Sequence, residues 1–191
     1  ADDGQNGIVV TPGANFGVTE ANVLALEPIF RGADAVLAQL EIPLDAVVAA
    51  LTLAKRSGAL AVLDAGPAQQ VDDVLLRAAD IVSPNETEAE AMTGVVIRNV
   101  ADARAAAERL RARGADRVVL KLGALGAYYL GHDGECHVPA FAIEPVDTVA
   151  AGDAFTAALA IAWRTMDRPE ALRFANAAGA LAALKPGAQP S

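Results

Sequence analysis

Asp147-Thr148-Val149-Ala150-Ala151-Gly152-Asp153 joins an extended segment to an apolar helix, and only small residues stand at its centre. The first amides of a helix lack intrahelical partners and lie at the positive end of its dipole, so they favour an anion. Ala-Ala-Gly lets a phosphate approach the main chain, and Asp153 places a carboxylate where it can accept a proton from an attacking hydroxyl. The stretch therefore predicts a phosphate-handling turn, although an ordinary helix start with an acidic first turn has the same pattern.

Outward from this turn, short β-like runs alternate with longer helical runs, which is typical of crossover units and a mainly parallel sheet. Two further short runs, 128–130 and 136–139, surround Asp133-Gly134 and predict a hairpin that adds an antiparallel edge. We expect one α/β domain over residues 1–191. The other expected strands are 8–11, 35–40, 60–63, 81–83 and 118–122, and the expected helices are 20–30, 44–57, 74–79, 86–93, 102–113, 152–164 and 169–184.

Composition excludes several classes of function. The chain has 191 residues, and 15 Lys and Arg against 24 Asp and Glu give a formal net charge of −9, so nucleic acid and anionic membranes are poor partners. No apolar run reaches the roughly 18 residues that a membrane-spanning helix needs. A single cysteine, Cys136, excludes an intramolecular disulfide and favours a reducing, cytoplasmic location.

Polar residues follow several of the expected strands. Ligands of open α/β sheets bind beyond the carboxyl ends of the strands, so these residues are expected to share one cleft. The sequence has neither a Walker P-loop nor a G-x-G-x-x-G motif, and phosphate handling must therefore use the helix start at Gly152. The strand-end residues are Glu41, Asp64, Asn85, Glu88, Gly123 and the 147–153 turn.

The 147–153 turn resembles the signature of the ribokinase-like carbohydrate kinases, the PfkB family. Five further segments resemble the same family in the same order, so the likeness covers essentially the whole chain. It implies a three-layer α/β/α fold, of which residues 1–191 supply the nucleotide-binding and catalytic portion without the family's N-terminal part and lid. The five segments are Gly13–Asn15, Gln39–Pro43, Pro84–Glu88, Leu122–Gly126 and Lys185–Ser191.

The resemblance also implies roles for the residues of the turn and of the sugar site. Asp153 would be the catalytic base on the sugar hydroxyl, and the amides of Ala150, Ala151, Gly152 and Asp153 would form an anion hole. Such positioning and charge stabilisation are what phosphoryl transfer chiefly requires. Glu41 would hold a sugar hydroxyl, although from the residues alone it could equally cap the helix after Pro43.

Nucleotide and metal contacts follow from the same resemblance. Mg²⁺ would be held through water by Glu88, although Asn85 and Glu88 also fit a capping box with no metal. An activating K⁺ would take oxygen ligands, which suit a hard ion. The implied nucleotide contacts are Asn85, Lys121, Gly123, Gly126, Gly152 and Asn176, and the implied K⁺ ligands are Asp147, Val149, Ala182, Lys185, Gly187 and Ser191.

The implied reaction is transfer of the γ-phosphate of ATP to the 5-hydroxyl of D-ribose, and a homodimer is the implied assembly. Another sugar or nucleoside kinase of the family is the first alternative, and a non-catalytic nucleotide-binding fragment is the second. One segment departs from the family: Asp64-Ala65-Gly66-Pro67-Ala68 stands where Asn-Pro-Ala-Pro is usual.

Overall fold

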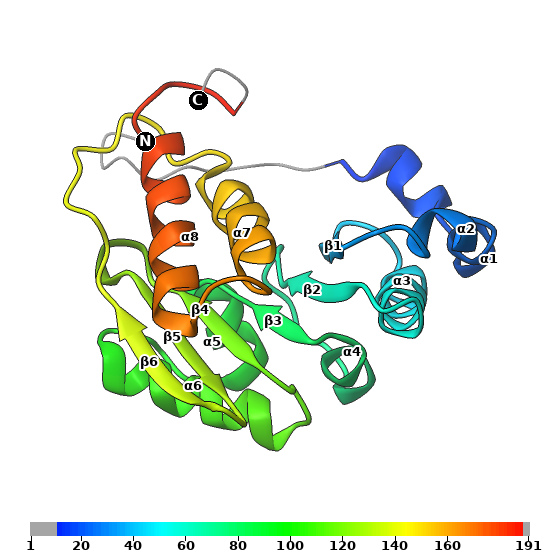
Figure 1. Cartoon of the computed structure of the whole chain (residues 1–191), viewed down its shortest axis with the longest axis horizontal. Coiled ribbons are helices and arrows are strands. Elements are labelled where there is room, and N and C mark those ends of the chain that lie inside the picture. The colour runs from blue at the N-terminus through cyan, green and yellow to red at the C-terminus, as the bar shows by residue number, and fades with distance from the viewer. Residues whose placement is uncertain (1–10, 189–191) are drawn as a thin grey trace.

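The computed structural model describes residues 11–188, whose strands form one six-stranded sheet in chain order (Figure 1). The first four strands pair in parallel, and the last two are added antiparallel. This confirms the mainly parallel sheet with an antiparallel edge. The strands are β1 (Ala35–Ala38), β2 (Leu60–Asp64), β3 (Ile81–Ser83), β4 (Val118–Lys121), β5 (Ala127–Gly131) and β6 (Gly134–Val138).

Helices cover both faces of the sheet and complete the three expected layers. Because side chains alternate along a strand, Leu63 and Leu120 face one apolar core, while Val62 and Val119 face the other. The first core packs against α3 (Leu44–Arg56), α4 (Asp73–Ala78), α5 (Glu86–Thr93) and α6 (Val100–Ala112). The second packs against α7 (Ala151–Ala162) and α8 (Arg168–Ala182), which lie side by side in Figure 1.

The expected helix over 20–30 is wrong in its continuity. The structure has a short 3₁₀ turn, η1 (Gly13–Gly17), and then two helices, α1 (Glu20–Leu24) and α2 (Glu27–Phe30). Pro28 has no backbone N–H to continue α1, but it is tolerated in the first turn of α2. Thr19 caps α1 as expected. Of the expected strand 8–11, residues 8–10 lie outside the described residues, and Thr11 is not in a strand.

The hairpin turn also differs from the expectation. His132 and Asp133 form the two-residue turn, because Gly134 pairs with Gly131 and already belongs to β6. Gly134 has a φ of 130°, which a side chain would disfavour. None of the described helices is both long enough and apolar enough to cross a bilayer.

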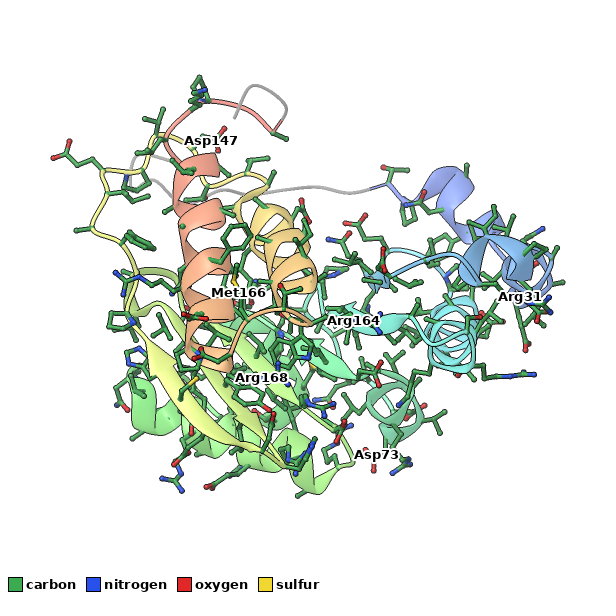
Figure 2. The ribbon with its side chains drawn as sticks, in the orientation of Figure 1. Arg31, Asp73, Asp147, Arg164, Met166 and Arg168 are labelled. Carbon is green, nitrogen blue, oxygen red and sulfur yellow. The ribbon has the colours of Figure 1, made fainter. Side chains whose placement is uncertain are left out.

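α7 and α8 are held together at both ends. Near the start of α7, a Cβ on Gly179 would lie 3.1 Å from the carbonyl oxygen of Ala151, a tight contact, so glycine favours this close approach of the helices. Figure 2 shows Arg168 at the turn between the helices, where its guanidinium stands 3.9 Å from the centre of the Trp163 ring. These contacts fix α7 relative to α8 at both of its ends.

Candidate active site

The start of α7 presents unpaired amides. Ala150, the N-cap, has φ 63°, an uncommon conformation for a residue with a side chain. The Ala151 N–H donates to the Thr148 carbonyl at 3.2 Å, so one of the four expected donors is engaged in the turn. Among residues 11–188, the amides of Gly152 and Asp153 have no hydrogen-bond acceptor. Two adjacent N–H groups at the positive end of a helix are therefore available to an anion.

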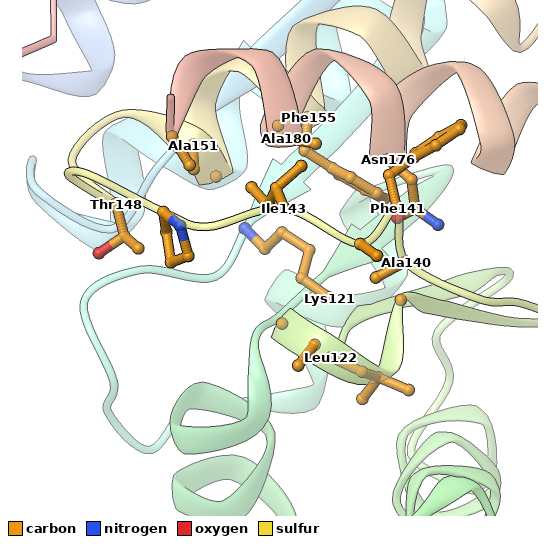
Figure 3. A pocket seen from close by; sticks show the side chains of 18 residues that line it. Lys121, Leu122, Ala140, Phe141, Ile143, Thr148, Ala151, Phe155, Asn176 and Ala180 are labelled. Carbon is orange, nitrogen blue, oxygen red and sulfur yellow. The ribbon is translucent and has the colours of Figure 1, made fainter. Parts of the chain in front are cut away.

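A pocket of about 470 Å³ lies beside this helix start. Figure 3 shows Lys121 and Leu122 on one side of it and Ala151, Phe155 and Ala180 on the other. Most of its lining is apolar, which suits a nucleobase, and its polar end lies at Lys121 and Gly152. Five of the six residues expected to contact the nucleotide line this pocket: Lys121, Gly123, Gly126, Gly152 and Asn176.

Two of these residues shape the wall of the pocket. Asn176 is buried and donates from Nδ2 to the carbonyls of Val138 and Pro139, at 3.1 and 3.2 Å. These bonds hold the start of the segment that carries Ala140 to Pro145 along the pocket. Gly126 has φ 94°, and a Cβ there would overlap the Val138 carbonyl oxygen. Backbone from β6 therefore packs directly on Gly126.

Asn85, the sixth expected nucleotide contact, begins α5 and lies outside the pocket lining. It forms a capping box with Glu88: the Glu88 N–H donates to Asn85 Oδ1 at 2.9 Å, and the Asn85 N–H donates to Glu88 Oε2 at 2.8 Å. A parallel bridge between Asn85 and Lys121 places this box next to the polar end of the pocket. The capping box, which the sequence offered as an alternative to a metal-binding role, is thus present in the structure beside the pocket.

Burial raises the pKa of the Glu88 carboxyl, and the nearby Lys121 ammonium partly opposes this effect. Burial also raises the pKa of Glu86, which stands beside Gly123. Both Glu88 oxygens already accept from Asn85, at 2.8 Å each, so Glu88 fits a hydrated Mg²⁺ held through water better than a directly bound ion. Within the described part of the chain, no three His, Cys, Asp or Glu residues form a metal-binding group.

Glu41 lies apart from the first pocket. It is exposed and lines a second hollow of about 430 Å³ with Pro12, Phe16 and Leu40. The alternative prediction, that Glu41 caps the helix after Pro43, is wrong, because Pro43 is the N-cap of α3 and no side chain caps this helix. Gln39, two residues earlier, donates from Nε2 to Asp153 Oδ1 at 2.9 Å. Asp153 therefore connects the helix start at the first pocket to the segment that carries Glu41.

Sequence reasoning missed Gln39 as a site residue, although it belongs to the quoted 39–43 segment. It also did not pair Asp64 with another side chain. In the structure Asp64 accepts from Lys121 Nζ at 2.5 Å and from Thr156 Oγ1 at 2.7 Å, and its side chain is only 7% exposed. Both partners lie far from Asp64 in the chain, so no local pattern indicates them.

Of the residues expected at the K⁺ site, Asp147, Val149 and Gly187 meet near the end of α8, where Figure 2 shows Asp147. The Val149 N–H donates to Asp147 Oδ1 at 3.0 Å, and the Gly187 N–H donates to Oδ2 at 2.9 Å. These backbone bonds lower the pKa of Asp147, so the carboxylate is ionised at neutral pH. An ionised carboxylate is an oxygen ligand of the kind that suits a hard cation. Ser191 lies outside the described residues.

This fold, with its pocket and unpaired helix start, is that of a carbohydrate kinase: the chain belongs to the pfkB family, whose sequence profile matches residues 1–191. It is 38% identical over 194 residues to the ribokinase of Haemophilus influenzae and 36% identical over 191 residues to that of Staphylococcus aureus. These matches cover 100% and 99% of this chain. The chain spans 63% of the length of each relative.

Solved structures agree with these relatives. The ribokinase of Arabidopsis thaliana, complexed with ribose and ATP, matches with a TM-score of 0.89 and 34% identity, over 98% of this chain and 62% of that one. The ribokinase of Thermotoga maritima matches with a TM-score of 0.84 and 32% identity, over 98% and 62% of the two chains. The fold described above is therefore the ribokinase-like fold.

Proposed function

We propose that this chain carries the nucleotide-binding and catalytic portion of an ATP-dependent phosphotransferase that transfers the γ-phosphate to the 5-hydroxyl of D-ribose. The observation that carries the proposal is the position of Asp153. Its own amide and that of Gly152 are available at one end of the pocket, and its carboxylate extends toward the Gln39–Glu41 segment. An anion site and a base thus occupy adjacent residues, as in-line phosphoryl transfer requires.

The pocket gives the nucleotide a direction. Its apolar side, with Phe141, Ile143 and Ala180, suits the adenine, while Lys121 and Gly152 mark the end for the phosphates. Asp153 accepts the proton of the attacking hydroxyl, and the amides of Gly152 and Asp153 donate to the oxygens of the transferred group. Mg²⁺ would neutralise phosphate charge near Glu88, and K⁺ would hold the turn at Asp147.

D-ribose as the acceptor is supported by the relatives. The ribokinases of Haemophilus influenzae and Staphylococcus aureus cover the whole chain, and the Arabidopsis thaliana structure is a complex with ribose and ATP. In this chain Glu41 would hold a sugar hydroxyl from the neighbouring hollow. The proposal includes a cytoplasmic location, which the single cysteine favours, and a homodimer.

Steady-state kinetics of Asp153→Ala in the full-length protein test the role of the base. We expect kcat with D-ribose to fall by about two to four orders of magnitude, because a positioned base is lost. The affinity for ADP should stay within about threefold, which provides the internal control. If kcat decreased by less than about tenfold, Asp153 would not be the catalytic base.

A panel of acceptors tests the sugar. Initial rates with D-ribose, 2-deoxy-D-ribose, D-fructose and adenosine give kcat/KM for each, and we expect D-ribose to be the best substrate. An equal or higher value for fructose or adenosine would move the proposal to another kinase of the family. ADP binding with no transfer to any acceptor would favour the non-catalytic alternative.

A further inference from the structure

A buried ion pair lies under the start of α7. Asp64 ends β2 and Lys121 ends β4, on either side of β3. Lys121 Nζ is 2.5 Å from Asp64 Oδ1, and the two side chains are 11% and 7% exposed. Thr156, one turn into α7, donates from Oγ1 to Asp64 Oδ2 at 2.7 Å. Each carboxylate oxygen thus has its own donor, and the position of Asp64 is fixed from both the sheet and the helix.

The Lys121 ammonium lies close to Gly152, which carries one of the two available amides. A Cβ added to Gly152 would meet Lys121 Nζ at 3.7 Å as its nearest neighbour. Lys121 and Gly152 also line the same pocket, and Figure 3 shows the amine end of Lys121 reaching into it on the side of Ala151. The lysine and the helix start therefore present positive charge to one small volume from two directions.

Lys121 keeps donor capacity toward that volume. An ammonium has three N–H donors, and among residues 11–188 Asp64 is the acceptor assigned to Lys121. A buried ion pair is on average a poor stabiliser compared with apolar side chains of the same size. Stability alone therefore gives little reason for a lysine at this position, whereas an incoming anion would use the remaining donors.

We propose that Lys121 contacts the transferred phosphoryl group, and that Asp64 and Thr156 are positioning residues that hold its ammonium in place. This inference rests on the proposed kinase function. In the reaction the bond from phosphorus to the bridging oxygen of ADP breaks, and a bond to the sugar oxygen forms. The hydroxyl proton goes to Asp153. Lys121 gives up no proton and donates hydrogen bonds to the equatorial oxygens, where charge is spread in the transition state.

Calorimetric titration of the full-length protein with ADP and with the β,γ-imido analogue of ATP tests this assignment. The two nucleotides differ by the γ-phosphate that Lys121 should contact. We expect Lys121→Met to lower the affinity for the analogue by about 10- to 100-fold, the range of a charge-assisted contact. The affinity for ADP should fall by less than about threefold. Asp64→Asn keeps the Lys121 ammonium but holds it less firmly. We therefore expect a smaller loss of affinity, confined to the analogue.

The double variant Asp64→Asn/Lys121→Met separates contact from folding. Lys121→Met alone leaves the buried Asp64 carboxylate without its opposite charge, which lowers the thermal midpoint, whereas the double variant has a neutral pair and should recover it. Recovery of the midpoint without recovery of analogue affinity supports the contact. Equal effects on ADP and the analogue, or no effect, would overturn the role of Lys121 and leave the kinase proposal standing. If the wild type binds neither nucleotide, both proposals fail.

Discussion

Gln39 Nε2 donates to Asp153 Oδ1 across 2.9 Å, although the two residues are 114 positions apart in the chain. The bond joins the segment after β1 to the first turn of α7. No described residue donates to the other carboxylate oxygen, Oδ2, so that oxygen is open to the acceptor hydroxyl of the proposed reaction. Gln39 thus orients the carboxylate of Asp153, the proposed base.

Replacing Gln39 tests this relationship. Gln39→Leu removes the donor, and we expect kcat to fall roughly three- to tenfold because the carboxylate is less well oriented. Gln39→Glu should lower kcat further, since a like charge then stands next to Asp153. Affinity for ADP should not change in either variant. Steady-state kinetics and calorimetry decide the matter, and wild-type kcat in both variants would refute the orienting role.

The Gly152→Ala variant tests the proposed phosphate site separately from the stability of the fold. The added methyl makes only an ordinary contact with Lys121, and alanine is a better helix former by about 0.5–1 kcal/mol, so the thermal midpoint should be unchanged or higher. The same methyl fills the approach to the amides of Gly152 and Asp153. We expect kcat at least about tenfold lower. A stable variant with full activity would place the phosphoryl group elsewhere.

Gly126 lines the pocket, and Gly134, at the start of β6, is a matched control position outside it. Both have positive φ, at 94° and 130°. A Cβ on Gly126 would overlap the Val138 carbonyl and lie 2.6 Å from the Ala140 nitrogen, whereas a Cβ on Gly134 meets nothing within 4 Å. We expect Gly126→Ala to cost more than about 3 kcal/mol in the free energy of unfolding and Gly134→Ala about 1–2 kcal/mol. Urea denaturation measures both, and equal losses would contradict the close packing.

The lowered pKa of Asp147 predicts that this residue contributes to stability in a pH-dependent way. Backbone hydrogen bonds from Val149 and Gly187 lower its pKa below the usual 3.8. Its contribution is therefore complete well above pH 3.8 and is lost as the pH falls through the lowered pKa. The difference in thermal midpoint between wild type and Asp147→Asn should be constant from about pH 5 to 7 and shrink at lower pH.

The exposed Glu144→Gln is the control for this titration, because Glu144 is three residues away in the same segment. It should leave the profile of the midpoint against pH parallel to that of the wild type. A difference for Asp147→Asn that grows as the pH falls would show that the two backbone bonds do not favour the ionised form.

Residues that end secondary-structure elements, such as proline and glycine, explain which parts of the fold the sequence predicts well. β3 and α5 match the expected bounds, 81–83 and 86–93, because Pro84 separates them and Gly94 ends the helix in a left-handed conformation. The continuous helix 20–30 fails at Pro28, where a local rule overrides the apolar pattern. The pocket beside α7 also follows from pattern, because it forms where strand ends and helix starts meet.

The side-chain partners within the site could not be predicted in this way. The contacts of Asp153 with Gln39 and of Asp64 with Lys121 and Thr156 depend on which strand ends the sheet order brings together and which face each residue takes. Asn176 is predicted to contact the nucleotide and does line the pocket, but the two carbonyls to which its amide donates could not be predicted. Such roles arise from long-range geometry, which a single sequence does not encode in its local periodicity.

The left-handed conformation of Ala150 restricts which amino acids can replace it. A β-branched residue such as valine or threonine would be strained at φ 63°, whereas glycine and asparagine adopt this conformation readily. Mutational drift at this position is therefore confined to a few small or amide-bearing residues. The constraint at Ala150 thus comes from its backbone conformation, not from a contact of its side chain.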